Sequence, residues 1–288
     1  MAYTNFIPTM WAVGIEKALE KLYVFADDCN RKYEGTVSKQ GESVKILGVG
    51  RPTITRISKE NRNKDINDVE EVEDTSVIMY INQIAYFNFM VGDIDKAQAS
   101  EDGIMNALQD ETSEGLADEA DKYIADLVKD SSVKKVFAND AKVVNGATAS
   151  GAVNILEAID AAIQKLYENN VKPTAKIVID MSPRFYTIFK QAYITKDTDN
   201  SDIMANGRVG KYGNAIVKVS NNVTKSQNGE SDYIMVRTPR AIAYANPLTH
   251  VEPYRPEKKF ADAVKGYMLF DAKVVRPKEI VNLNVKYA

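Results

Sequence analysis

The chain has 288 residues, of which 44% are hydrophobic and 27% charged, and its formal net charge is −3. This is the composition of an ordinary globular protein with room for one large domain or two modest ones. The slight acidic excess argues against a general nucleic-acid binder, which carries a basic excess. A single cysteine, Cys29, excludes an internal disulfide and predicts folding in a reducing cytoplasm. No apolar run approaches the ~18 residues that a membrane span needs, and no secretion signal is recognised.

The first predicted element is an amphipathic helix that follows Pro8, with Thr9 as its N-cap. Its apolar residues recur at three- and four-residue steps, which places them on one helix face. They are Trp11, Ile15, Leu19, Leu22, Tyr23 and Ala26. Because this helix is far in sequence from the later core, it can dock on a neighbouring molecule as well as on its own chain. Trp11 is therefore a candidate inter-subunit contact.

Residues 36–91 predict a long β arm around a charged tip. Alternating segments bounded by glycines read as two outgoing and two returning strands, with Phe87 and Phe89 on one face of the last. The outgoing strands lie at 41–47 and 52–57, after a short stretch at 36–37, and the returning strands at 77–81 and 85–91. Between them, residues 59–74 are almost all charged or Asn, which predicts a solvated tip. Since such a ribbon is marginally stable alone in water, a partner surface is expected to stabilise it.

A long, acidic helix is predicted over residues 93–130, with Asp93 and Asp95 as candidate N-caps. Apolar residues that include Leu116 and Ile124 form its buried stripe. The segment has a net charge of −9, which leaves +6 for the rest of the chain. Gly115 inside the helix costs roughly 1 kcal/mol relative to alanine. It therefore predicts a kink or hinge at this point.

Residues 146–248 alternate helix and strand and predict a compact α/β unit. One helix follows Ser150, a buried strand occupies 176–181, and Ser182-Pro183 has the pattern of an N-cap followed by proline in the first turn. Strands are predicted on both sides of the unit and at its end. They lie at 133–144, as a pair joined by an Asn139-Asp140 turn, and at 215–220, 233–237, 241–245, 267–275 and 280–285.

Residues with catalytic chemistry are sparse. His250, the only histidine, lies between two prolines in a predicted loop with no ligand spacing. Cys29 lacks a basic cluster that would activate its thiol, so a buried thiol is expected. The glycines at 207, 210 and 213 lead into a strand and not into a helix, so they predict a surface loop instead of a phosphate cradle. Arg208 and Lys211 of this loop are candidate contacts with an acidic neighbour. No catalytic residue, metal site or cofactor is expected.

The order of these parts resembles the major capsid protein of tailed bacteriophages, which has the Hong Kong 97-type fold. Tyr33-Glu34-Gly35 and residues 41–46 resemble the opening of that family's extended loop. Phe87-Asn88-Phe89 and residues 93–98 resemble its return strand and the entry to its spine helix. The Asp180-Met181-Ser182-Pro183 junction and the Gly207–Gly213 loop resemble parts of its axial domain. The order and spacing of these segments together carry the resemblance.

The resemblance implies an α+β fold with five regions along the chain. They are an N-terminal arm at 1–35, an extended β loop at 36–91, a peripheral domain with the spine helix at 92–145, an axial domain at 146–248, and a return to the peripheral domain at 249–288. The charged tip of the extended loop is the expected site of contact between subunits. Its candidate contact residues are Arg62, Lys64, Glu70 and Glu71. The resemblance also suggests that the spine helix bends at Gly115 before the shell expands.

The function implied by the resemblance is self-assembly. Subunits would form hexamers and pentamers that close into an icosahedral shell around double-stranded phage DNA. The shell would assemble in the host bacterial cytoplasm and become the virion capsid, without a membrane. Scaffolding, portal and decoration proteins are further partners, and DNA would be held without sequence-specific contacts. Because the chain starts at the arm, a scaffold is expected to be a separate protein.

Two other functions are compatible with the sequence. An encapsulin-like compartment has the same fold and holds cargo enzymes in place of DNA, so fold alone does not separate it from a capsid. A soluble α/β enzyme with a site in the 146–248 unit is the alternative from another class. The contents of purified particles would decide the first question, and a monomer or dimer that binds a small ligand would favour the enzyme.

Overall fold

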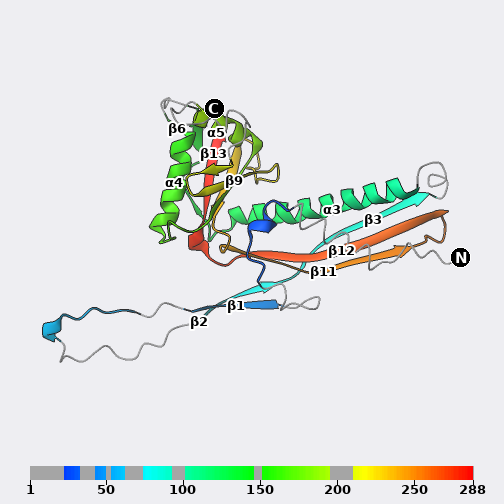
Figure 1. Cartoon of the computed structure of the whole chain (residues 1–288), viewed down its shortest axis with the longest axis horizontal. Coiled ribbons are helices and arrows are strands. Elements are labelled where there is room, and N and C mark those ends of the chain that lie inside the picture. Colours follow the sequence, from blue (N-terminus) through cyan, green and yellow to red (C-terminus); the bar gives the residue numbers. More distant parts are fainter. Residues whose placement is uncertain are drawn as a thin grey trace.

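The computed structural model describes residues 23–32, 43–49, 53–61, 74–92, 101–145, 151–194 and 210–287. Figure 1 shows an elongated molecule in which a compact α/β body stands over a long sheet and helix. The sheet and helix extend to one side of this body, and a narrow ribbon extends to the other. The molecule is therefore extended, with two long projections from one compact body.

The compact body is built on an eight-stranded mixed sheet. Its strand order is β6-β5-β13-β10-β7-β9-β8, with β4 also beside β13. The strands are β4 (Lys134–Lys135), β5 (Ala141–Val144), β6 (Ala152–Asn154), β7 (Ile177–Met181), β8 (Lys211–Tyr212), β9 (Ala215–Val219), β10 (Ser231–Arg237) and β13 (Ile280–Tyr287), the last preceded by the 3-10 turn η5 (Pro277–Glu279). Every residue of β7 is buried, as expected for a strand covered on both faces.

Two helices, α4 (Ile155–Glu168) and α5 (Pro183–Ile194), pack against each other beside this sheet. The side chain of Asn154 caps α4 by accepting a hydrogen bond from the backbone N–H of Leu156 at 3.0 Å. The predicted N-cap of α5 is confirmed, because the Ser182 hydroxyl accepts a hydrogen bond from the Phe185 backbone N–H at 3.2 Å. Phe185 and Phe189 then bury one face of α5 in the core.

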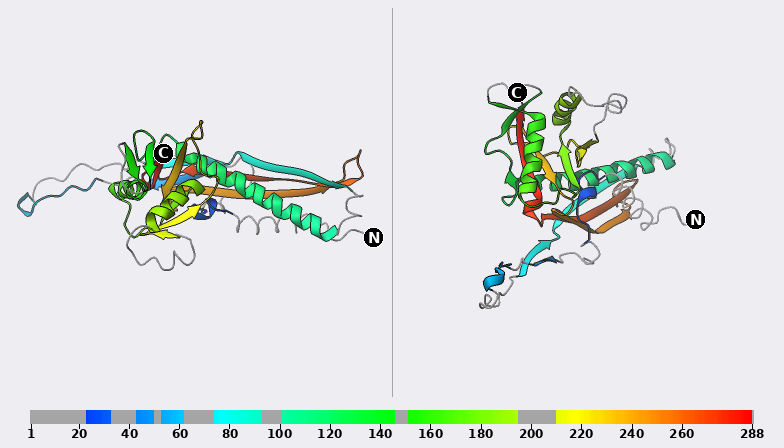
Figure 2. Two further views of the ribbon diagram at one scale, coloured as in Figure 1. Left: turned by 90° about the horizontal axis from the view of Figure 1, so that it is seen from above. Right: turned by 60° about the vertical axis from the view of Figure 1, so that its left-hand side comes forward.

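The long sheet has the order β11-β12-β3 and is antiparallel. Its strands are β3 (Gln83–Gly92), β11 (Ile242–Tyr254) and β12 (Ala261–Val274). The helix α3 (Glu101–Asp126), followed by the 3-10 turn η4 (Leu127–Lys129), runs along one face of this sheet, as both views of Figure 2 show. Phe87 and Phe89 stack on that face at a centroid distance of 6.0 Å, which confirms that they share it. Gly266 is required here, because a Cβ would lie 2.6 Å from the ring of Phe87.

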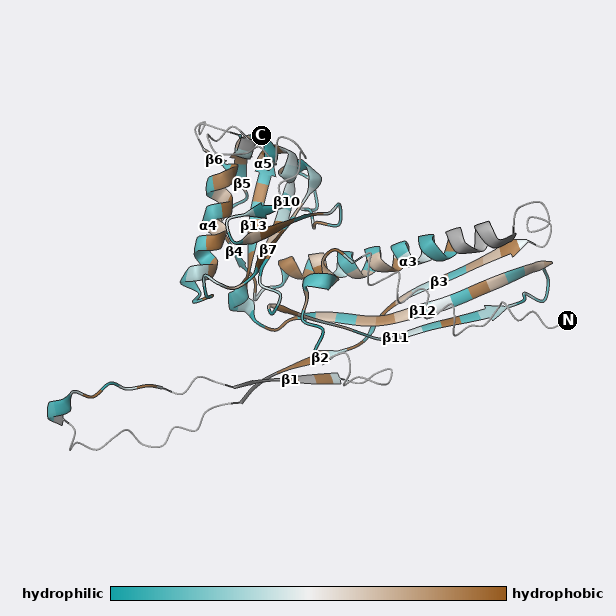
Figure 3. Cartoon of the chain, in the orientation of Figure 1, coloured by the Kyte–Doolittle hydropathy of each residue, from teal (hydrophilic) through white to brown (hydrophobic). Residues whose placement is uncertain are grey.

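The ribbon consists of β1 (Ser43–Val49) and β2 (Asp74–Tyr80), which pair antiparallel from Ser43↔Tyr80 to Val49↔Asp74. Its base packs on the long sheet through a second small core. Val44, Ile46, Met79 and Ile81 lie there against Ala243, Ala245 and Leu269. Figure 3 shows hydrophobic residues where β2 approaches the sheet and a hydrophilic turn, η3 (Lys59–Asn61), at the far end.

The structure corrects three predictions for the N-terminal third. Tyr23 is not helical and Ala26 begins a 3-10 turn, η1 (Ala26–Asp28), because side chains from other elements bind the backbone of this segment. The remainder of that predicted helix lies outside the described residues. Residues 53–57 form no strand, since the register of β1 with β2 ends at Val49↔Asp74. Residues 85–91 do not belong to the ribbon but to β3, whose Phe87 side packs toward α3.

Three further corrections concern the rest of the chain. β4 and β5 are not a hairpin, because each pairs in parallel with β13. The strands near 131–145 and 280–285 therefore lie in the eight-stranded sheet, whereas the sequence grouped them with the spine helix. His250 lies in β11 and not in a loop; β11 is an edge strand, which tolerates the prolines on both sides of His250. The kink at Gly115 stays a prediction; α3 is one continuous helix through this residue.

Candidate subunit-contact surfaces

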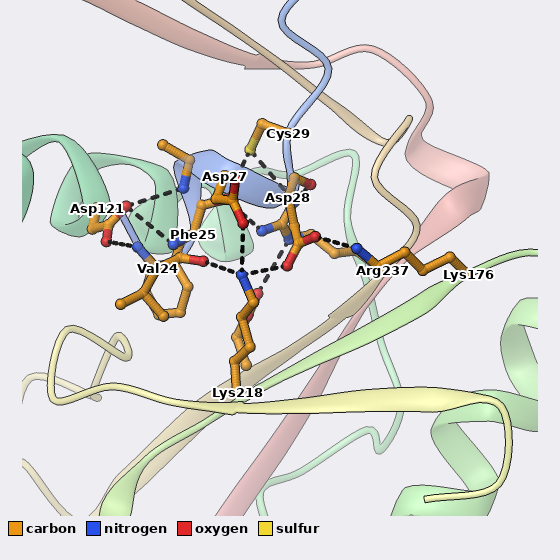
Figure 4. A network of polar contacts seen from close by, with 11 residues as sticks. Val24, Phe25, Asp27, Asp28, Cys29, Asp121, Lys176, Lys218 and Arg237 are labelled. Carbon is orange, nitrogen blue, oxygen red and sulfur yellow. Dashed lines mark hydrogen bonds and ion pairs between the residues drawn. The ribbon is translucent and has the colours of Figure 1, made fainter. Parts of the chain in front are cut away.

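The segment 23–31 connects the long helix with both sheets. The carboxylate of Asp121 on α3 accepts hydrogen bonds from three consecutive backbone N–H groups, those of Val24, Phe25 and Ala26, at 2.7, 3.1 and 3.1 Å (Figure 4). Burial raises the pKa of Asp121, and the three N–H donors act against that effect by stabilising the carboxylate. One side chain thus fixes the start of the segment to α3.

Arg237 on β10 holds the same segment to the eight-stranded sheet. Its guanidinium is fully buried and donates to the carbonyl oxygens of Asp28 at 2.5 Å and Phe25 at 2.9 Å. It also donates to the carboxylate of Asp180 on β7 at 3.2 Å. Burial raises the pKa of the Asp180 carboxyl to about 6, although Arg237 acts to lower it. A buried charge of this kind is tolerated only because its donors are matched by acceptors.

Two lysines complete the junction. Lys176 Nζ lies 2.6 Å from one carboxylate oxygen of Asp28, and Lys218 Nζ lies 2.6 Å from the other. Burial acts to raise the pKa of Asp28, but the two ammonium groups outweigh it and lower the pKa. The segment also joins the long sheet, because the Asn30 N–H donates to the Ile242 carbonyl at 2.9 Å and the Tyr244 N–H donates to the Asn30 carbonyl at 3.1 Å. We call residues 23–30 with their partners the junction.

The outer face of the long sheet, opposite α3, carries exposed apolar side chains. On β3 they are Ile84, Tyr86 and Met90, which are 50%, 80% and 50% exposed. At the end of the β11–β12 hairpin, Phe260 is 87% exposed. The three exposed apolar residues of β3 share one face of the strand, as is typical of a surface that another protein covers.

A groove of about 860 Å³ runs between α3 and β3. Ala85, Phe87 and Leu116 form part of its apolar lining, and Glu119, Lys122 and Asp126 contribute charge. β3 is an edge strand of the long sheet in the described part of the chain. The groove therefore offers apolar surface and backbone hydrogen-bonding groups together, which suits an extended segment of a partner.

Most of the contact residues predicted from sequence lie outside the described residues: Trp11, Arg62, Lys64, Glu70, Glu71 and Arg208. Lys211 is exposed on the edge strand β8, where it faces Ile216 of β9 in register. Gly115 is exposed on α3, and a Cβ added there would meet no atom within 4 Å. The structure does not bring Lys211 and Gly115 together, and their roles stay predictions.

The two residues considered for catalysis, Cys29 and His250, lie apart from a recognisable active site in the described ranges. Cys29 is buried, and burial raises the pKa of its thiol to about 11, so the expectation of a buried thiol is confirmed. His250 is exposed with its ring 5.5 Å from that of Tyr267. Within the described ranges, no three His, Cys, Asp or Glu side chains are grouped as metal ligands. None of the helices described has both the length and the apolar character needed to cross a bilayer.

The junction was not predicted from the sequence. Arg237 and Asp180 lie in predicted strands, and Asp121 is one of the many acids of the long helix. The only available signal was a charged residue at an otherwise apolar strand position, as in the run Tyr233 to Arg237. Such a residue is buried only when it is paired, and its partners here lie 57 and 209 residues away along the chain.

Comparisons with known proteins agree on one kind of protein. A family model described as "Phage capsid protein" matches residues 87–283. A structure from Mycobacterium phage Che8 is 25% identical with a TM-score of 0.68, and the match covers 90% of each chain. The capsid structure of cyanophage P-SCSP1u is 15% identical, with a TM-score of 0.66 and coverage of 92% of this chain and 88% of that one. A virus-like particle from Pyrococcus furiosus is 11% identical, with a TM-score of 0.56 and coverage of 96% and 98%. No curated protein matches the sequence.

Proposed function

Because the chain belongs to the phage capsid protein family and is a major capsid protein of a tailed bacteriophage, we propose that its copies assemble as hexamers and pentamers. These capsomers would close into an icosahedral shell that encloses double-stranded DNA. The observation that carries the proposal is the ribbon, which packs on its own chain only through its base in the described residues. A two-stranded ribbon is not stable alone, so its outer part needs the surface of another subunit.

The parts of the molecule suggest their roles in the shell. We assign the N-terminal arm to residues 1–35, the extended loop to the β1–β2 ribbon with its tip, and the spine helix to α3. The long sheet with α3 would form the peripheral domain. The eight-stranded sheet with α4 and α5 would form the axial domain. The exposed apolar face of β3 and the α3–β3 groove would be covered by neighbouring subunits.

The role is structural, and we assign it no catalytic step. Assembly would occur in the host bacterial cytoplasm, where the free thiol of Cys29 stays reduced. Portal, scaffolding and decoration proteins would be further partners of the shell. Electron microscopy of the protein expressed with and without its neighbouring genes tests the proposal. Closed shells of uniform diameter are expected, whereas a small monodisperse species under both conditions would contradict it.

An encapsulin-like compartment is the second candidate. The likeness to the virus-like particle from Pyrococcus furiosus favours it, but that likeness is weaker than those to the phage capsids and shows the fold alone. The contents of purified particles separate the two candidates. Packaged double-stranded DNA supports the capsid, and a resident cargo protein without DNA supports the compartment.

The acidic face of α3 suggests how the inner wall of the shell would interact with packaged DNA. Asp110, Glu111 and Glu114 are exposed, and the 93–130 segment has a net charge of −9. If α3 lines the interior, this charge repels the DNA backbone and keeps the genome from adhering to the wall. We expect that changing these three acids to Asn, Gln and Gln slows DNA ejection from filled particles, most strongly at low ionic strength. Ejection at the wild-type rate at every salt concentration would contradict this role.

Gly115 is proposed as the hinge of α3. Gly115→Ala should raise the free energy of unfolding of the subunit by about 0.5–1 kcal/mol, because alanine favours the helix and the added methyl group meets nothing. Urea unfolding of the unassembled subunit measures this change. If the helix must bend at this point before the shell expands, the same variant will expand more slowly. Normal expansion with an identical helix shape in both states would contradict the hinge.

A further inference from the structure

A polar cavity of about 680 Å³ lies between η4, which follows the long helix, and the loop that joins β9 to β10. Three lysines line it, one from each neighbouring part of the chain: Lys129 from η4, Lys135 from β4 and Lys225 from the loop. Asp130 is the only acid among the lining residues that the structure describes. The cavity is therefore a basic site in a chain whose net charge is negative.

Two of these lysines are available for a ligand. Lys129 has an ion pair with Asp126 at 3.1 Å on the same helical turn. Among the residues that the structure describes, no carboxylate lies within ion-pair distance of Lys135 or Lys225. The ammonium of Lys135 lies 5.6 Å from the centre of the Tyr233 ring, which holds it over the cavity wall. In the described ranges neither ammonium is in direct contact with a carboxylate, although Lys135 acts on Asp140 from a longer distance.

Asn282 shows which kind of anion would fit. It lines the cavity and is only 2% exposed, and its amide N–H donates to the Val128 carbonyl at 3.3 Å. That contact leaves its Oδ1 buried without a hydrogen-bond donor. A buried acceptor without a partner is costly, so a ligand that brings an N–H group beside its negative charge would fit this site. An acidic peptide has both features, whereas a phosphate group of nucleic acid has no N–H.

The same chain contains an acidic peptide of this kind. Residues 65–74 include six acids and no basic residue. They follow the outer part of the ribbon, and Figure 1 shows η3 at the end farthest from the rest of the molecule. The segment ends at Asp74, the first residue of β2, so Asp65 lies nine residues from the paired ribbon and at most about 32 Å from it. The acidic segment can therefore contact a subunit that lies beside the ribbon.

We infer that the cavity lined by Lys129, Lys135, Lys225 and Asn282 receives the acidic segment 65–74 of a second copy of the chain. This inference rests on the proposed self-assembly and names one contact that drives it. Carboxylates of the segment meet the lysines, and a backbone or amide N–H of the segment donates to Asn282 Oδ1. Such a contact joins two different surfaces, and its repetition closes a ring of subunits.

A charge-exchange experiment tests this contact. Lys135→Glu with Lys225→Glu should lower the yield of shells at least about tenfold, and Glu70→Lys with Glu71→Lys should do the same, because like charges then face each other. The chain that carries all four substitutions should regain shells, since the ion pairs are restored in reverse. Lys142→Glu with Lys172→Glu, which changes two exposed lysines outside the cavity, is the matched control and should assemble normally.

The possible results distinguish a failure of this contact from a failure of the proposed self-assembly. Absence of shells in the unchanged protein would contradict the proposed function, whereas normal shells in both charge-reversed pairs would overturn only the contact. Failure of the four-fold variant, with its subunit still folded by circular dichroism, would also overturn it. Carbodiimide treatment of unchanged shells gives a test without mutation. It should join Lys135 or Lys225 to an acid of residues 65–74 through an amide bond, and linkage of these lysines only to other acids would overturn the contact.

Discussion

Replacing Arg237 by methionine is expected to lower the free energy of unfolding of the subunit by about 3–5 kcal/mol, because breaking a buried ion pair leaves its other members desolvated and unpaired. The substitution leaves Asp180 buried, and it removes the donors to the Phe25 and Asp28 carbonyls. It therefore weakens the eight-stranded sheet and the attachment of the N-terminal segment together. Urea unfolding of the unassembled subunit measures the loss.

Arg240 supplies the matched control. It also lies in an ion pair, with Glu279 at 3.4 Å, but its side chain is 59% exposed. Arg240→Met should therefore change the free energy of unfolding by less than about 1 kcal/mol. A second variant, Arg237→Met with Asp180→Leu, removes both buried charges and should lose less stability than Arg237→Met alone. An equal, small loss for Arg237→Met and Arg240→Met would show that the junction does not hold the segment.

Removal of the ribbon's outer part is expected to abolish shell assembly while the subunit stays folded. Val49 and Asp74 face each other in the β1–β2 register, so an Asn-Gly turn can replace residues 50–73 and close a short hairpin. The small core between the ribbon base and the long sheet is kept, because its residues lie outside the deletion. Electron microscopy should find no closed particles, and the urea midpoint of the subunit should change little.

A second variant tests whether the side chains of the tip or only the length of the ribbon is needed for assembly. In it, residues 62–73 are replaced by twelve Gly and Ser residues, which keeps the reach of the ribbon and removes the charged side chains from most of the tip. If the tip provides contacts, this variant also fails to assemble; if only reach matters, it assembles normally. Closed shells formed by the shortened chain would contradict the proposal that the ribbon links subunits.

Elements set by local pattern were predicted correctly from sequence. Ser182 and Pro183 predicted the start of α5, because an N-cap and a proline in the first turn need only their immediate neighbours. β7 was predicted from one short apolar run, and α3 from its length and apolar stripe. The two phenylalanines of β3 were placed on one face because a strand alternates with a period of two. The order of these parts was enough to reveal the resemblance to the capsid family.

The strand partners were predicted wrongly from the sequence. β13 lies between β5 and β10 and pairs in parallel with β5, a partner more than 130 residues earlier. The 133–144 stretch looked like a hairpin because its two strands are close in sequence, and nothing local shows that both pair with β13. β3 was assigned to the ribbon because it follows β2, although its apolar side packs toward α3. Sheet membership depends on contacts between distant segments, which a single sequence does not contain.

Local sequence was enough to predict most of the helices and strands and the segments that are too polar to be buried, because these depend on neighbours along the chain. Which charged residues are buried became clear only from the folded chain. Asp121 looked like any other acid of the long helix, yet its carboxylate binds three backbone N–H groups of the N-terminal segment. Arg237 became a buried anchor because Asp180 and two carbonyls converge on it from distant positions. Burial of a charge requires several partners at once, and those partners meet only after the chain has folded.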